Sequence, residues 1–558
     1  MAALSLAIPL AAATPTLAQA PPLQLPGAVE PGRPPDAVAP PQIDFQLELL
    51  IPDSRRDIPD EEAAAVKFDL AGLQITGVTV YPPARMKALY EKLIGTEVSL
   101  ADLFKVANAI EALYRADDYV LSRAFIPAQR VTDGVFKIEV IEGYVSEIEI
   151  QGDVAGVQEL IEATLKGLTA EKPLKARTLE RRLLLVNDLP GVSAQGVLRP
   201  SQATVGAAQL VVNVGIDHYS GSFSANNRQS KFAGPVAFTV TGASHAFTGA
   251  GERTGFVHYM TSDWDEQRFN RVQHERSIGS NGMRATVGLE YGTSEPGGNI
   301  KGGASGTVRA KSFGFDAGVS FPFIRSRTEN FTGQLDASLR NTKVKQILQQ
   351  SGSNTFSQDR IRKIRMGFTY ERADELQGVT RIGLDWHQGF KAFGWGKANP
   401  SRDDGEFDFT KLTADIVRLQ RIAYGFSLLL AASGQSSSDP LLASEEFTVG
   451  GARFGRGYDP SEISGDDGVA FSAELQFRND GDFGLGLVKD FELYSFYDFG
   501  SVWNKNRADQ KGSTETIGID SLVSWGGGIR TNIEYELGGE IMGFGLNVEY
   551  AKPLSRVP

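Results

Sequence analysis

Cysteine is absent from this chain of 558 residues, which excludes a disulfide framework and any thiolate metal site. Only five histidines occur, and they lie in separate segments without the spacing of metal ligands. Basic residues are also outnumbered: 56 Lys and Arg stand against 68 Asp and Glu, a formal net charge of -12. Binding of nucleic acid requires a basic surface. We therefore expect no metal, no cofactor and no nucleic-acid partner.

Arrangements of residues that support catalysis are missing as well. No Ser–His–Asp set is evident, and the glycine-rich segment 302–306 lacks the strand–helix context of a phosphate loop. We therefore expect no enzymatic activity. Two adjacent acids, Asp466 and Asp467, could suit calcium. We expect them instead to be solvated in a turn.

Long apolar runs are absent beyond the N-terminus, which excludes a transmembrane helix but not a transmembrane β-barrel. Residues 1–20 are apolar and end in Ala18-Gln19-Ala20, which predicts a signal peptide, although a charged start is missing. Residues 21–66 are rich in proline and predict an extended linker. They show no convincing amphipathic helix that could plug a pore.

Two small α+β modules are predicted over 67–144 and 145–215. Each has the order strand, helix, helix, strand, strand. In the first, Ser99 and Asp102 resemble a capping box before an apolar helical face. Neither module carries a nucleophile or a metal cluster. We interpret both as binding modules whose strand edges could pair with an extended guest chain.

Helical periodicity vanishes over 216–558. About fifteen alternating segments follow, each of roughly ten residues, and one reads Met542, Phe544, Leu546, Val548 and Tyr550 on a single face. A soluble sandwich would also alternate, but with shorter strands. We predict a transmembrane antiparallel β-barrel.

Two motifs in this barrel region carry a resemblance to a known family. Residues 450–468 read GGARFGRGYDPSEISGDDG, and Phe496-Tyr497-Asp498 follows on a strand. A spacing of two places Phe496 and Asp498 on one face. Together with the two modules, these motifs resemble the two-partner secretion transporters of bacterial outer membranes. In that family two POTRA domains precede a sixteen-stranded barrel.

The resemblance implies roles for particular residues. Loop 445–468 would fold into the lumen and place Arg456, Gly457 and Tyr458 at its tip, with Gly455 where the family has valine. Arg456 would meet Asp498 of the inner wall, and Glu474 is a second possible partner. In the first POTRA domain the matching family pattern is carried by Tyr119, Pro127, Gln129, Gly134, Glu142 and Gly143.

The function implied by the resemblance is export of one exoprotein. The exoprotein's N-terminal secretion domain would be held unfolded in the periplasm by the POTRA domains and would then thread through the barrel. The remaining expected partners are outer-membrane lipids and the barrel-insertion machinery, and we expect a monomer. Alternatives are an insertase of the same superfamily, a diffusion porin and a surface adhesin.

The strand count raises a question about the C-terminus. We count about fifteen strands by Leu554, whereas barrels of single bacterial chains have an even number. We therefore expect a truncated gene product that lacks the closing strand. The alternative is a strand overlooked between Gly302 and Phe356.

Overall fold

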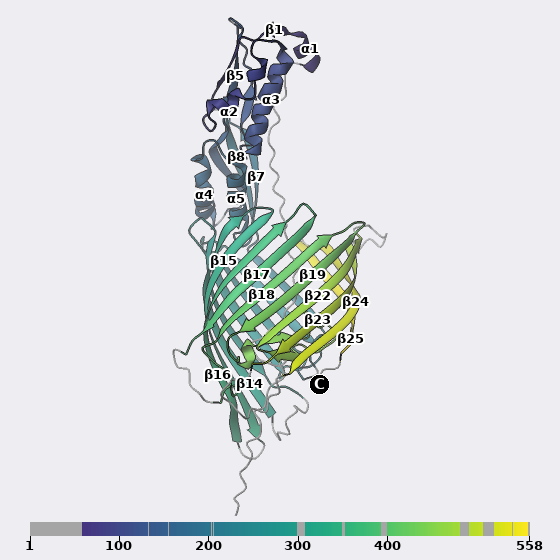
Figure 1. Cartoon of the computed structure of the whole chain (residues 1–558). Helices are drawn as coiled ribbons and strands as arrows, with labels where there is room; N and C mark the ends of the chain where they lie inside the picture. The colour runs from purple at the N-terminus through teal and green to yellow at the C-terminus, as the bar shows by residue number, and fades with distance from the viewer. Residues whose placement is uncertain are drawn as a thin grey trace, which may run out of the picture.

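The computed structural model describes residues 59–555, except for 132, 155, 202–203, 205, 231, 298–306, 349–351, 392–398, 480–489, 506–517 and 538–539. Two small modules stand end to end above one rim of a large β-barrel (Figure 1). The predicted signal peptide and most of the predicted linker lie outside the described residues. None of the described helices is long and apolar enough to cross a membrane.

The first module packs helices against a three-stranded sheet of order β2-β5-β4. Helix α3 begins at the capping box that the sequence predicts: the Ser99 hydroxyl accepts from the Asp102 amide, and the Asp102 carboxylate accepts from the Ser99 amide. Its apolar face, with Leu103 and Ile110, is buried against the sheet. The elements are α1 (Asp60–Ala65), β1 (Lys67–Asp69), β2 (Gly72–Thr76), α2 (Pro83–Lys87), η2 (Glu91–Leu93), β3 (Glu97–Ser99), α3 (Leu100–Ala116), β4 (Arg123–Phe125) and β5 (Val135–Ile141).

The second module repeats this topology. In both three-stranded sheets, the first strand pairs in parallel with the last, and the last pairs antiparallel with the strand before it. Leucines of α5, among them Leu179 and Leu183, fill a separate core. The elements are β6 (Tyr144–Gly152), α4 (Gln158–Leu165), η3 (Lys166–Thr169), α5 (Ala176–Asn187), β7 (Val192–Pro200) and β8 (Ala207–Ile216).

The barrel is a single antiparallel sheet of fifteen strands in the described residues. Alternation gives it two faces: on β22, Val469 and Leu475 point outward and are exposed, whereas Ser472 and Glu474 point inward and are buried. The predicted fold class is thereby confirmed. The strands are β9 (Tyr219–Asn226), β10 (Ala237–His245), β11 (Arg253–Thr261), β12 (Gln267–Ile278), β13 (Met283–Ser294), β14 (Thr307–Arg325), β15 (Glu329–Leu348), β16 (Gly352–Ala373), β17 (Gly378–Gly389), β18 (Thr410–Arg421), β19 (Phe426–Ser437), β22 (Asp467–Asn479), β23 (Asp490–Trp503), β24 (Ile519–Leu537) and β25 (Glu540–Pro553).

Strands β9 and β25 are the two ends of this sheet, and no pairing joins them among the described residues. The described part of the barrel thus has one strand fewer than the sixteen expected. Between Gly302 and Phe356 the described residues form β14, β15 and the start of β16. The overlooked strand is therefore not found there, and the closing strand stays a prediction.

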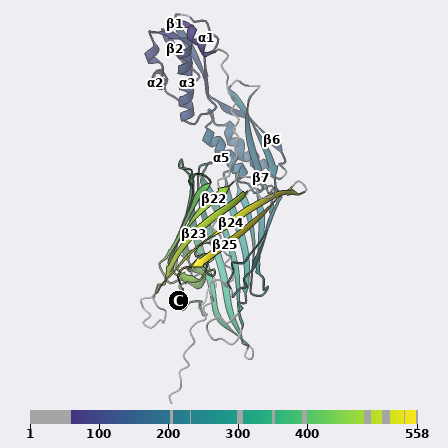
Figure 2. The ribbon, with the colours of Figure 1, turned by 90° about the vertical axis from the view of Figure 1, so that its right-hand side faces the viewer.

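The second module is attached to the barrel through α5 and its C-cap residue Asp188. The Asp188 carboxylate accepts two hydrogen bonds from the Arg325 guanidinium, at 2.6 and 2.8 Å. Glu180 accepts from the backbone amide of Arg327 at 2.6 Å. Arg181 donates to the carbonyl of Pro322 at 2.8 Å. Figure 2 shows the module on one side of this rim.

Candidate functional site: a loop folded into the barrel

Between β19 and β22 the chain turns back into the barrel instead of extending away from it. This segment, residues 438–466, carries η4 (Ala443–Glu445) and a short hairpin of β20 (Phe447–Val449) with β21 (Ile463–Gly465). We call it the inner loop. Its apolar residues Val449, Phe454 and Ile463 pack with Val502 and Leu522 of the wall. This small core fixes the loop inside the lumen.

At the tip of the inner loop, Arg456 forms a two-pronged contact with Asp498 on β23. Its Nε lies 3.0 Å from Oδ2 and its Nη2 lies 2.9 Å from Oδ1. The backbone amide of Arg456 also donates to Oδ2, at 2.9 Å. Asp498 is fully buried, so its charge requires this compensation. The structure therefore brings together the two residues that the sequence pairs.

Glu474 on β22 is also a partner of Arg456. Its carboxylate lies 2.5 Å from Nη1 of Arg456 and 2.8 Å from Nη1 of Arg530 on β24. Arg530 in turn contacts Glu492 at 2.7 Å. Arg456 thus bridges two strands of the inner wall, and Arg530 extends the network to a third.

The remaining residues of the two motifs shape the tip. Phe496 lies beneath the Arg456 guanidinium, whose central carbon is 3.5 Å from the ring centroid. The Tyr458 hydroxyl lies 2.9 Å from the carbonyl oxygen of Val523. Gly455 and Gly457 have φ of +85° and +109°. A Cβ at 455 would approach Leu522 to 2.6 Å, which explains why this tip has glycine rather than valine.

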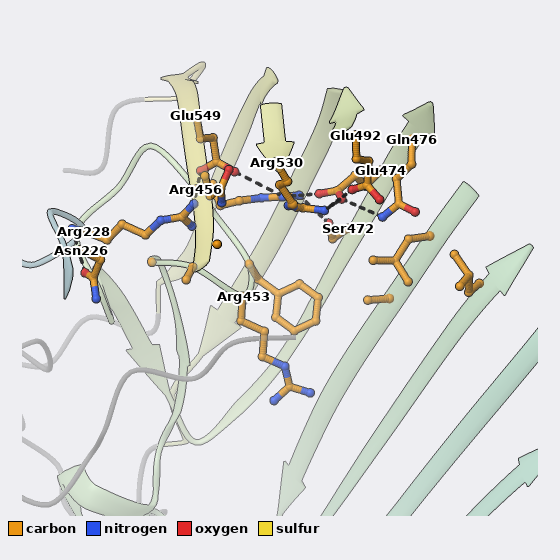
Figure 3. A pocket seen from close by; sticks show the side chains of 18 of the residues that line it. Asn226, Arg228, Arg453, Arg456, Ser472, Glu474, Gln476, Glu492, Arg530 and Glu549 are labelled. Atoms are coloured by element: carbon orange, nitrogen blue, oxygen red, sulfur yellow. Dashed lines mark hydrogen bonds and ion pairs between the residues drawn. The ribbon is translucent and has the colours of Figure 1, made fainter. Parts of the chain in front are cut away.

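A cavity of about 1510 Å³ separates the inner loop from the far wall. Figure 3 shows Arg228, Arg453, Arg456 and Glu549 around it. Polar and charged side chains from several strands, among them Gln435 and Gln476, also line it. The lumen beside the loop is consequently polar and has room for water or for a chain in extended form.

The outer end of the inner loop, remote from the modules, is held by a second set of charges. The buried Glu445 carboxylate lies 2.7 Å from Nζ of Lys363 on β16 and 2.9 Å from Nζ of Lys411 on β18. Nearby, Arg402 contacts Asp466 at 2.7 Å. We call Glu445, Lys363 and Lys411 the outer clamp.

The expectation that Asp466 and Asp467 are solvated is wrong. Both are buried, at 0 % and 3 % exposure. Asp466 accepts from Arg402 and from the backbone amides of Leu441 and Lys505, and Asp467 contacts Lys505 at 3.2 Å. They tie the loop to its neighbours, and the described residues contain no cluster suited to a metal ion.

The predicted POTRA residues lie in the first module, far from the inner loop (Figure 1). Glu142 accepts from the Tyr114 hydroxyl at 2.6 Å and from the Thr79 amide at 2.7 Å. Burial raises the pKa of the Glu142 carboxyl, but these hydrogen bonds outweigh it and hold that pKa below its usual value. Glu142, directly after β5, is thus hydrogen-bonded to α3 through Tyr114.

The other POTRA residues also have local structural contacts. Gln129 bonds both backbone groups of Lys137, at 2.8 and 2.9 Å. The Tyr119 ring lies against Lys175, and Pro127 is half-buried after β4. At Gly134 and Gly143 a Cβ would collide with backbone oxygens, at 2.9 and 2.4 Å. These contacts stabilise the module.

Sequence reasoning missed several members of the site. Ser472 donates to Asp498 at 2.7 Å, Arg530 contacts Glu474, and Glu549 lies 3.7 Å from Arg456. Ser472 shares the inward face of β22 with Glu474, a signal that alternation provides. No motif marks Arg530 or Glu549, because their role depends on strand register.

Comparison with known proteins identifies relatives of both parts of the chain. Residues 68–143 match the model of the POTRA domain, ShlB-type, and residues 272–531 match that of the haemolysin secretion/activation protein ShlB/FhaC/HecB. The heme/hemopexin transporter protein HuxB of Haemophilus influenzae (strain 86-028NP) is 24% identical over 481 residues, which cover 84% of this chain and 80% of that protein.

Solved structures show the same fold. CdiB from Escherichia coli aligns with a TM-score of 0.64 at 17% identity, covering 90% of this chain and 92% of that one. CdiB from Acinetobacter baumannii aligns with a TM-score of 0.55 at 12% identity, covering 90% and 95%.

Proposed function

We propose a route by which this chain exports a secreted exoprotein, here called the cargo. The chain is a member of the haemolysin secretion/activation family of two-partner secretion transporters of the bacterial outer membrane. A secreted exoprotein is the partner that the family implies. In the proposal it travels unfolded through the lumen, beside or in place of the inner loop. The observation that supports the proposal most directly is that Arg456 forms ion pairs with Asp498 and Glu474 inside a polar lumen.

The POTRA modules lie in the periplasm and, in the proposal, present the cargo's N-terminal secretion domain to the barrel. Support comes from their free sheet edges: β2 and β4 in the first module, and β6 and β7 in the second, each have a pairing partner on only one side among the described residues. An extended chain can add to such an edge through backbone hydrogen bonds. Outer-membrane lipids, the barrel-insertion machinery and a monomeric state complete the proposal.

No catalytic step is part of the proposal. Folding of the cargo outside the cell would supply the free energy that drives export. The insertase is less favoured, because residues 272–531 match the secretion/activation family. A plain diffusion porin does not account for the two modules or for the buried network around Arg456.

Capture by the POTRA pair can be tested with residues 67–215, whose two modules have separate cores. We expect this fragment to bind the cargo's unfolded N-terminal segment and to bind the folded form at least about tenfold more weakly, because only an extended chain can pair with an edge. Isothermal titration with both forms measures the difference. Equal affinity for both would contradict edge capture.

A further inference from the structure

Beyond the lumen, the outward face of β14, β15 and β16 changes character along its length. Phe313, Leu335 and Ile364 lie on this face and are 44 %, 50 % and 37 % exposed, as expected of side chains that contact lipid. Asp316, Asp336 and Arg365 point the other way and pair inside the lumen. The three strands have 19, 20 and 22 residues and extend below the rest of the barrel (Figure 1).

Past the apolar band, toward the end remote from the POTRA modules, the same outward face becomes basic. It carries Arg309 and Lys311 on β14, Lys343 and Lys345 on β15, and Arg360 and Arg362 on β16. The register places Lys311 directly opposite Lys343, and Arg309 directly opposite Lys345. Six cations therefore gather on one outward surface of a chain whose net charge is -12. We call it the basic face.

Cations directly opposite each other destabilise a sheet unless an anion lies between them. Arg309 has such an anion in Glu295. Lys311, Lys343 and Lys345 have no acidic side chain within 4.0 Å among the described residues. Arg362 donates to the amide oxygen of Asn341 at 3.0 Å and to backbone carbonyls, none of which carries a charge. Within the described part of the chain, the charges of Lys311, Lys343 and Lys345 are thus not compensated by any acidic side chain.

The position of the basic face indicates which kind of anion compensates its positive charge. Lys311 precedes Phe313 by two residues on the same face of β14, a distance of about 7 Å along the strand. The cations consequently lie just outside the hydrocarbon layer, on the side of the outer leaflet, and point toward lipid rather than into the lumen. Phosphate groups of lipid headgroups occupy this level.

We propose that the basic face binds the phosphorylated headgroup of a glycolipid in the outer leaflet, with Lys311, Lys343 and Lys345 on its phosphates. The adjoining apolar band supplies contacts for the acyl chains of the same molecule, which a free anion lacks. The binding would anchor and orient this side of the barrel in the membrane. It is independent of cargo export.

Titration of the full chain in zwitterionic detergent with bisphosphorylated lipid A tests the proposal, with thermal unfolding as the readout. We expect the lipid to stabilise the barrel and the triple variant Lys311→Gln/Lys343→Gln/Lys345→Gln to bind it about 100-fold more weakly, at about fivefold per lysine. Without lipid, the triple variant should unfold at the same temperature as the unchanged protein or higher, because like charges are removed. That readout separates lost binding from lost folding.

Arg276→Gln/Arg372→Gln is the matched control, because both arginines lie exposed on the outward face near the POTRA end. Its affinity should change less than about twofold. Unchanged affinity in the triple variant would overturn the proposal. So would equal binding of dephosphorylated lipid A, equal stabilisation by inorganic pyrophosphate, or an equal loss in the control.

Discussion

Replacing Arg456 with alanine is expected to abolish export of the exoprotein while the barrel still assembles. The change removes the positive charge between Asp498 and Glu474, which are 0 % and 2 % exposed. Loss of one partner from a buried pair costs about 3–5 kcal/mol, and less where water reaches the site. The tip of the inner loop would then leave the wall. Secretion assayed from intact cells, with heat-modifiable migration of the barrel as the assembly check, measures both effects.

Two further variants define what Arg456 supplies. Arg456→Lys retains the charge but not the planar fork, so we expect partial export. Arg453→Ala is the control, because Arg453 lies three residues earlier on the loop and pairs with the partly exposed Asp415. It should export normally. Normal secretion by Arg456→Ala would show that the network is dispensable.

The second large effect is expected at the outer clamp. Glu445→Ala would remove the carboxylate that lies less than 3 Å from both the buried Lys411 ammonium group and the partly buried Lys363 ammonium group. Loss of one partner from a buried ion cluster costs about 3–5 kcal/mol, and less where water reaches one of the ions, as at Lys363. We expect the outer end of the loop to detach and the conductance of single barrels in planar bilayers to rise severalfold.

The clamp can be separated from general damage to the loop. Glu445→Ala/Lys363→Met/Lys411→Met replaces the whole ion cluster by apolar groups, which is often nearly neutral for stability. It should restore much of the low conductance. Glu462→Ala, at an exposed site on the same loop, is the control. Wild-type conductance in Glu445→Ala would rule out a role of the clamp in closing the pore.

Much of this architecture follows from local patterns. Alternation of apolar residues determines which face of β22 meets lipid, and the capping box at Ser99 determines where α3 begins. The pairing of Arg456 with Asp498 was also predictable, through the resemblance of two motifs and the period-two spacing of Phe496 and Asp498. The first two signals lie within a few residues of the feature that they predict, whereas the pairing of Arg456 with Asp498 spans 42 residues and rests on the resemblance.

The outer clamp and the buried acids had no such signal. Glu445 meets lysines 82 and 34 residues away, and Asp466 meets an arginine 64 residues away. Adjacent acids in a glycine-rich segment favour a solvated turn when read alone. Only the folding of two distant loops across the barrel end buries them. Residues of this kind depend on tertiary register rather than on sequence pattern.

Passage of the cargo through the lumen is the central claim, and trapping a stalled exoprotein tests it directly. Because the chain has no cysteine, single cysteines can be placed at Gln476, which lines the lumen cavity, and at Leu475, its outward neighbour on β22. A cysteine in the stalled cargo should form a disulfide with position 476 and not with position 475. Crosslinks at 475 alone, or at neither position while the cargo is stalled in the membrane, would contradict export through the barrel.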